Sequence, residues 1–106
     1  MSFHLSAENI RVDDGHILHA QLRNENGDLN DTSIDLNTVL GNDNGRFDWS
    51  GGGFSDSAEN IRFEIEGGEN VPILRARLFN LEGEAIDADC NLSERIGNDN
   101  GNFVMS

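Results

Sequence analysis

Two identical five-residue segments, GNDNG, carry polar side chains that could bind a ligand. They occupy residues 41–45 and 97–101. The amide of Asn can donate and accept hydrogen bonds, and the carboxylate of Asp can accept them. The same letters also predict a tight hairpin, because an Asn-Gly pair supplies the positive φ angles of a type I′ turn. Two interpretations stay open: a turn alone, or a turn whose polar groups also face a ligand.

Metal and phosphate chemistry do not fit these loops. If the invariant glycine of a calcium-binding EF-hand loop is placed at Gly45, its first ligand falls on Leu40, and placing it at Gly101 gives Ile96. The glycine run at 51–53 lacks the lysine and the following helix of a phosphate-binding loop. We expect no metal site and no cofactor.

Catalytic constellations are equally hard to find. The acidic pairs at 13–14 and at Asp87 and Asp89 do not lie in apolar runs that would raise a carboxyl pKa, as glycoside hydrolysis requires. No recognisable serine or cysteine nucleophile motif accompanies the three histidines. The lone Cys90 cannot form an internal disulfide, and we expect it to be a packing residue. The sequence therefore predicts that the protein is not an enzyme.

The charge balance limits the possible partners. The 106 residues contain 20 acidic side chains against seven basic ones, all arginine, for a net charge of -13. Such a field repels phosphate backbones and anionic lipid, so nucleic acid and membrane surfaces are excluded as expected partners. The sequence shows neither an apolar span nor a signal region, so we expect a cytoplasmic protein or one released by a non-signal route.

The chain is a tandem duplication. Residues 3–12 align with 54–63 and residues 17–50 align with 73–106, and about half of the aligned positions are identical. We define repeat 1 as residues 3–50 and repeat 2 as residues 54–106. At about 50 residues, a core in one repeat alone would be marginal, so we expect the copies to share one core in a single domain over residues 1–106.

The local patterns indicate a mostly β protein. Residues 18–22 and 74–78 alternate apolar and polar side chains, as half-buried strands do. Asn26-Gly27 predicts a hairpin between strands. The spacing of apolar residues in 36–41 predicts one helical turn that is capped at Gly41.

A known family shares these features. The chain resembles the cyanovirin-N family of mannose-binding lectins along its whole length, including the duplication, and its SAENIR repeat is most like the fungal members. The residues that carry the resemblance are Asn30, Ser33, Ile34, Asp35, Leu36, Asn37, Val39, Asn42, Gly45, Trp49 and Phe54, and in the second copy Asn91, Leu92, Ile96, Asn98, Gly101 and Phe103.

The resemblance implies a pseudo-twofold, strand-exchanged β fold with short helical turns. One lobe would hold residues 1–38 with 95–106, and the other would hold about 39–94. Gly51-Gly52-Gly53 would be the hinge of a monomer that is able to form a domain-swapped dimer. The two disulfides of the founding member are replaced here by the apolar pairs Ala7 with Leu22 and Ala58 with Leu78.

The resemblance also implies two sugar-binding pockets, each of which includes one GNDNG segment. The first would use Phe3, His4, Leu5, Ser6, Arg23, Asn24, Glu25, Asn26, Asn98, Asp99 and Asn100. The second, in which apolar residues or glycine replace several polar contacts of the founding member, would use Asn42, Asp43, Asn44, Gly53, Asp56, Ser57, Phe79, Asn80, Leu81 and Glu82.

The implied function is a lectin. Its partners would be mannose-containing oligosaccharides or glycoproteins, with terminal α(1-2)-linked mannose as the recognised group. Short polar side chains suit this task, because each can exchange hydrogen bonds with several sugar hydroxyls. An alternative from another class is a duplicated protein-interaction scaffold that has lost its affinity for sugar.

Overall fold

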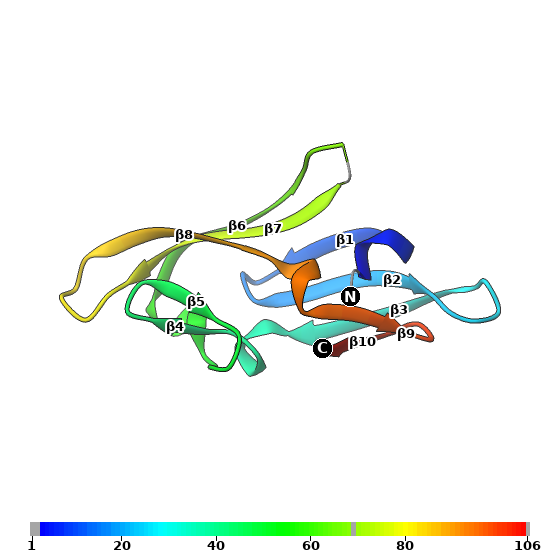
Figure 1. Ribbon diagram of the computed structural model, residues 1–106, viewed down its shortest axis with the longest axis horizontal. Coiled ribbons are helices and arrows are strands. Elements are labelled where there is room, and N and C mark those ends of the chain that lie inside the picture. The colour runs from blue at the N-terminus through cyan, green and yellow to red at the C-terminus, as the bar shows by residue number, and fades with distance from the viewer. Residues whose placement is uncertain (1–2, 69, 106) are drawn as a thin grey trace.

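The computed structural model describes residues 3–68 and 70–105, so positions 1, 2, 69 and 106 of the predicted domain lie outside the described residues. The described residues form ten strands and four short 3-10 turns (Figure 1). In chain order they are η1 (Phe3–Ser6), β1 (Ala7–Asp13), β2 (Ile17–Arg23), β3 (Leu29–Asp35), η2 (Leu36–Thr38), β4 (Gly41–Asp43), β5 (Arg46–Asp48), η3 (Phe54–Ser57), β6 (Ala58–Glu66), β7 (Val71–Phe79), β8 (Ala85–Asn91), η4 (Leu92–Glu94), β9 (Ile96–Asp99) and β10 (Asn102–Met105).

Each repeat folds into a three-stranded antiparallel sheet and a two-stranded hairpin. The sheets have the orders β1-β2-β3 and β6-β7-β8, and the hairpins are β4-β5 and β9-β10. The central strands β2 and β7 alternate buried and partly exposed residues along their length, as the sequence predicts. Both β1 and β6 contain a bulge at the same place in the repeat, where Asn9 and Asn60 adopt positive φ.

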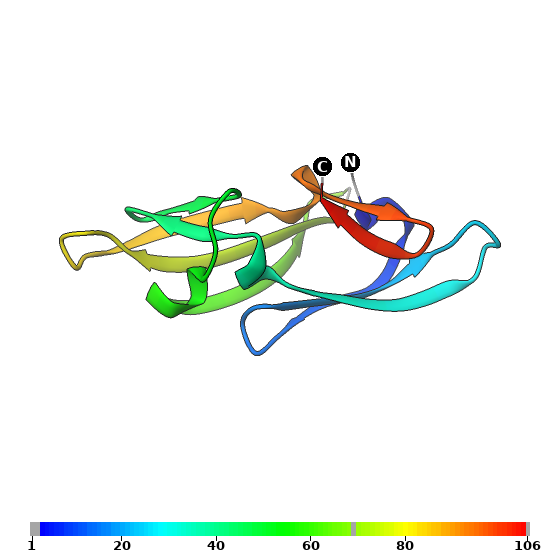
Figure 2. The ribbon, with the colours of Figure 1, turned by 90° about the horizontal axis from the view of Figure 1, so that it is seen from below.

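The hairpins are exchanged between the repeats. Hairpin β9-β10 of repeat 2 packs on η1 and β3 of repeat 1, and β4-β5 of repeat 1 packs on η3 and β8 of repeat 2. Figure 2 shows each hairpin on the sheet of the other repeat. The division of this domain into one lobe of about 1–38 with 95–106 and another of about 39–94 remains a proposal.

One core runs through both lobes. Equivalent side chains of the repeats are fully buried in it, among them Phe3 with Phe54 and Leu22 with Leu78. Leu22 lies opposite Ala7, and Leu78 lies opposite Ala58, in the strand register. The predicted apolar pairs therefore do pack at the core. No helix of the described residues is long and apolar enough to cross a membrane.

Both GNDNG segments form the predicted tight hairpin turns. Asn44 and Gly45 have φ values of 50° and 94°, and Asn100 and Gly101 have 52° and 90°. Positive φ at both central residues defines a type I′ turn, whose twist suits two paired strands. The predicted turn geometry is confirmed, and it is common to both interpretations of these segments.

The predicted helix cap at Gly41 is wrong. The helical turn η2 ends at Thr38 and is capped at Val39, while Gly41 begins strand β4. A Cβ atom at Gly41 would lie 2.8 Å from the nitrogen of Gly52 and 2.9 Å from the Cα of Gly51. Glycine is required there because two backbone segments approach each other closely.

Candidate functional site

Three segments that are distant in sequence meet at one end of the molecule. They are η1, the loop between β2 and β3, and the β9-β10 turn. The side-chain amide of Asn98 donates to the hydroxyl of Ser6 at 2.8 Å and to the carbonyl of Arg23 at 2.9 Å. Its carbonyl oxygen accepts from the backbone NH of Gly101 at 2.8 Å. One side chain thus fixes the segments of the first predicted site.

A second set of hydrogen bonds sets the loop geometry of this end. The side-chain oxygen of Asn100 accepts from the NH of Glu25 at 2.8 Å. The side-chain oxygen of Asn24 accepts from the NH groups of Asn26 and Asp28, both at 3.0 Å, which closes the loop on itself. Because these hydrogen bonds tie the loops together, the groups that the loops expose are presented in fixed positions.

The side chains of the first site differ in accessibility. Glu25, Asn26, Asp99 and Asn100 are exposed, and Leu5 is 76% exposed. These residues could contact a ligand directly.

Other predicted members of the first site support it from inside. Phe3 is fully buried, so its side chain can only hold the site from beneath. The Nδ1 atom of His4 is buried without a hydrogen-bond partner among the described residues. Arg23, by contrast, is exposed, and its guanidinium is engaged by Glu8 at 3.3 Å and by the carbonyl of Gly27 at 3.0 Å.

The opposite end repeats the same construction. The side-chain amide of Asn42 donates to the hydroxyl of Ser57 at 2.9 Å and to the carbonyl of Phe79 at 2.8 Å. Its oxygen accepts from the NH of Gly45, and the side-chain oxygen of Asn44 accepts from the NH of Leu81 at 2.9 Å. The turn β4-β5, the end of η3 and the β7-β8 loop therefore meet as the second predicted site requires.

The second site has a more apolar surface. Leu81 is 91% exposed, and Phe79 and Ile86 are also exposed. The side-chain oxygen of Asn80 is engaged inside its own loop by the NH groups of Glu82 and Glu84. The exposed polar residues of this predicted site include Asp43, Asn44, Asp56 and Glu82.

Gly53 lies away from the loop tips of the second site. It precedes η3 in the left-handed region, with φ of 71°, and its NH donates to the carbonyl of Asn37 at 2.8 Å. The side chain of Asn37 also exchanges hydrogen bonds with Ser55. Gly53 thus belongs to the junction between the repeats as much as to a ligand site.

The two candidate sites lie at opposite ends of the long axis, as Figures 1 and 2 show. The molecule measures 50 × 26 × 22 Å along its principal axes. A ligand with two branches could meet both sites only if it reached along the body or joined two molecules.

Sequence reasoning did not find what anchors the sites. It placed Asn42 and Asn98 among the sugar contacts, whereas their side chains are used to join the three segments. Asn30, whose side-chain amide donates to the carbonyl of Gly101 at 2.7 Å, was not among the predicted site residues. Its counterpart in repeat 2 is Ile86, so comparing the two copies gives no signal for this role.

Cys90 lies outside both candidate sites. It is buried in strand β8. Burial, together with the charges of Glu94 and Asp89, raises the pKa of its thiol to about 12. The thiolate is the reactive form, so Cys90 is inert at neutral pH, in keeping with a packing role.

The chain is similar to known proteins along its whole length. The family model described as the CVNH domain matches residues 3–104. A cyanovirin-N homolog from Neurospora crassa is 48% identical over 107 residues, which cover 97% of this chain and 96% of that protein. The NMR structure of a CVNH protein from Gibberella zeae is 50% identical with a TM-score of 0.93, covering 97% of this chain and 95% of the other. The NMR structures of a designed cyanovirin-N homolog lectin, LKAMG, give 42% identity and a TM-score of 0.93 over 100% of both chains.

Proposed function

The chain belongs to the CVNH family, and from this premise we propose that it is a lectin for mannose-type glycans. The preferred group in this proposal is terminal α(1-2)-linked mannose, as the resemblance to mannose-binding members implies. One observation carries the proposal: at each end an asparagine locks three loops together, so that the polar groups around it are presented in fixed positions.

The chemistry of the exposed groups supports this function. At the first end Asp99 can accept hydrogen bonds, the exposed amide of Asn26 can donate and accept them, and the NH2 group of Asn100 can donate them, as a ring of sugar hydroxyls requires. Each such bond contributes a net of about 1 kcal/mol, so one shallow site gives modest affinity. Two sites on one rigid body can raise the avidity for a branched or clustered glycan.

We propose the first end as the stronger site. Leu5 is exposed at the first end, but Glu25 and Arg23 there are charged and exposed, whereas the equivalent positions of the second end carry the exposed Leu81 and Phe79. A sugar hydroxyl that is buried against an apolar side chain without a partner weakens binding. The second site is therefore expected to bind mannose more weakly.

The proposed preference for mannose must be tested against a second class of sugar. A MoCVNH3 variant, 26% identical to this chain with a TM-score of 0.85, was solved in complex with (N-GlcNAc)4; the match covers 98% of this chain and 96% of that chain. N-acetylglucosamine oligomers are therefore the second ligand class to try.

The test is an NMR titration of isotope-labelled protein with α(1-2)-mannobiose, and separately with chitotetraose. We expect mannobiose to shift the amides of residues 23–26 and 98–100, with a weaker set at 42–44 and 79–82. Asp99→Ala should weaken the first set only, while Asp14→Asn, which removes a charge from a distant exposed turn, should leave both sets unchanged.

Other outcomes would change the proposal in defined ways. Shifts with chitotetraose alone would keep a lectin but replace mannose as its ligand. The absence of shifts at millimolar concentrations of either sugar would overturn the lectin proposal in favour of the interaction scaffold. Hydrolysis of either oligosaccharide during the titration would contradict the proposal that the protein is not an enzyme.

For the assembly we propose a monomer that can form a domain-swapped dimer, with Gly51-Gly52-Gly53 as the hinge. The junction is closely packed, since a Cβ at Gly51 would lie 2.9 Å from the Cα of Gly41. Exchange would therefore require local opening at high protein concentration. Size-exclusion chromatography should then show a second, dimeric species, and a single monomer peak at every concentration would contradict the exchange.

A further inference from the structure

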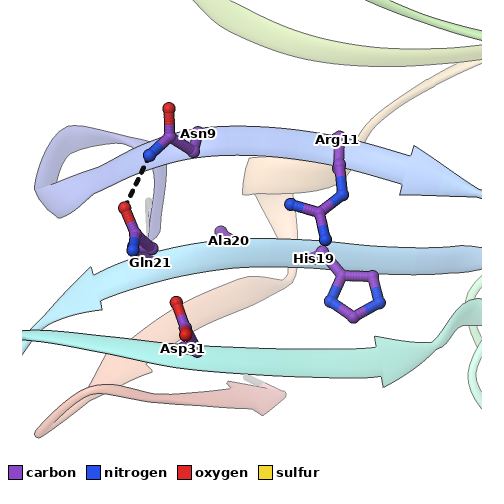
Figure 3. Close-up of a pocket in the computed structure, with 6 residues that line it drawn as sticks. All are labelled: Asn9, Arg11, His19, Ala20, Gln21 and Asp31. Atoms are coloured by element: carbon purple, nitrogen blue, oxygen red, sulfur yellow. Dashed lines mark hydrogen bonds between the residues drawn. The ribbon is translucent and has the colours of Figure 1, made fainter.

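A hollow on the outer face of the β1-β2-β3 sheet is separate from both candidate sugar sites. It has a volume of about 370 Å³. Figure 3 shows Asn9 and Gln21 on one side, Arg11 and His19 on the other, and Asp31 on the neighbouring strand. Its lining residues are Asn9, Arg11, His19, Ala20, Gln21 and Asp31, none of which belongs to a predicted sugar pocket.

The charges in this hollow are unevenly compensated. The Nε atom of Arg11 lies 3.2 Å from the carboxylate of Asp13, and the Nε2 atom of His19 lies 3.4 Å from it. Gln21 is held by Asn9, whose amide donates to its Oε1 atom at 2.6 Å. Asp31 is exposed, and none of the ion pairs or hydrogen bonds found among the described residues involves its carboxylate. The hollow therefore offers an uncompensated negative charge.

Repeat 2 shows what occupies the equivalent register position. Arg77 stands between Glu59 and Asp87 in β6-β7-β8, as Gln21 stands between Glu8 and Asp31 in β1-β2-β3. Its guanidinium lies 3.1 Å from Glu59 and 3.5 Å from Asp87.

Repeat 1 has the carboxylate but not the cation. The two sheets share the same register and the same bulge. In repeat 2 this arrangement places the guanidinium of Arg77 beside Asp87, which is the counterpart of Asp31. In repeat 1 the shorter, neutral Gln21 leaves Asp31 without that cation and leaves room beside it.

We propose that this hollow binds the guanidinium of an arginine side chain from a partner protein. Asp31 is the anchor, because a carboxylate accepts two parallel hydrogen bonds from a guanidinium. The Oε1 atom of Gln21, which already accepts from Asn9, can accept a second hydrogen bond from the guanidinium. Arg11 is compatible with a bound cation because Asp13 compensates its charge, and the net charge of -13 attracts basic partners. This arginine site is independent of the proposed sugar binding.

The direct test uses N-acetyl-L-arginine amide as the probe in an NMR titration, with the neutral citrulline analogue as its control. We expect saturable shifts of the backbone amides of Gln21 and Asp31 and of the side-chain amides of Asn9 and Gln21. Added salt should weaken them, because the pair is exposed to solvent. Equal shifts with the citrulline analogue would overturn the proposal, and so would the absence of shifts at millimolar probe.

Two variants test the assignment to Asp31. Asp31→Asn should weaken probe binding about three- to fivefold, the range of an exposed ion pair, while Asp14→Asn removes the same charge from an exposed turn and should leave binding unchanged. Gln21→Arg places the arginine of repeat 2 in repeat 1 and should block the probe. Wild-type affinity in either Asp31→Asn or Gln21→Arg would overturn the proposal.

Discussion

At the scale of single residues, the asparagines of the GNDNG segments are structural links. Asn98 and Asn42 each use both ends of the side-chain amide to hold a turn against two other segments. Their neighbours Asp99 and Asp43 are exposed. Within one short motif, therefore, the first asparagine builds the site and the aspartate that follows is free to face a ligand.

This division of roles predicts unequal effects of substitution on stability. Asn98→Ala removes three hydrogen bonds and leaves their partners unpaired, so we expect the free energy of unfolding to fall by about 2–3 kcal/mol. Asp99→Ala should change it by less than about 0.5 kcal/mol. Urea denaturation monitored by Trp49 fluorescence provides both values. Similar losses in the two variants would contradict the linking role of Asn98.

The carboxyl of Asp35 gives the protein a specific response to acid. Its pKa lies below the ordinary value of 3.8, mainly because His16 Nδ1 hydrogen-bonds to it at 2.8 Å and also because it accepts from the NH of Asn37. The resulting stabilisation is fully present above pH 3.8 and is lost as the pH falls through the lower folded-state pKa. Asp35→Asn should therefore reduce stability at pH 6 by more than it does at pH 2.5.

Urea denaturation at both pH values measures this effect. Asp14→Asn provides the comparison for removing one carboxylate from an exposed turn. If Asp35→Asn costs the same free energy at pH 6 and pH 2.5, the carboxyl does not contribute in the ionised form.

At the scale of elements, sequence patterns predicted what depends on near neighbours. The alternation in 18–22 and 74–78 and the Asn-Gly turns at 44–45 and 100–101 identified strands and hairpins, because side-chain period and φ preference are local properties. The role of Gly41 could not be predicted in this way. Its constraint comes from Gly51 and Gly52, which the hairpin β4-β5 brings back against it.

The candidate site was predictable to a similar extent. The family resemblance brought together three segments at each end, and their hydrogen-bonded contacts agree with it. It did not distinguish the side chains that point outward from those that face inward, such as Phe3. That distinction depends on the packing of the exchanged hairpin, which no local pattern encodes.

The close approach at Gly41 leads to a prediction about the junction of the repeats. Gly41→Ala places a methyl group within 3 Å of backbone atoms of Gly51 and Gly52, which cannot rotate away. We expect a loss of about 1–3 kcal/mol in unfolding free energy. Gly68→Ala is the control, since a Cβ there meets nothing within 4 Å. A Gly41→Ala protein as stable as Gly68→Ala would show that the junction can relax.

At the scale of the whole molecule, hairpin exchange makes two lobes depend on each other. Phe3 packs edge to face on Phe103 at a centroid distance of 5.3 Å, and Phe54 packs on Phe47 at 5.6 Å. In each pair one ring comes from repeat 1 and the other from repeat 2. Neither repeat can therefore complete its own core, and we expect both lobes to unfold in one transition.

Phe3→Ala tests this coupling, because Phe3 lies in one lobe only. Removing a fully buried ring should cost about 3–5 kcal/mol, whereas Leu5→Ala, at a 76% exposed position, should cost little. Amide signals from β2 and from β7, followed during urea denaturation, should shift together to a lower midpoint in Phe3→Ala. If β7 kept the wild-type midpoint while β2 unfolded early, the lobes would be independent and the exchanged hairpins would not couple them.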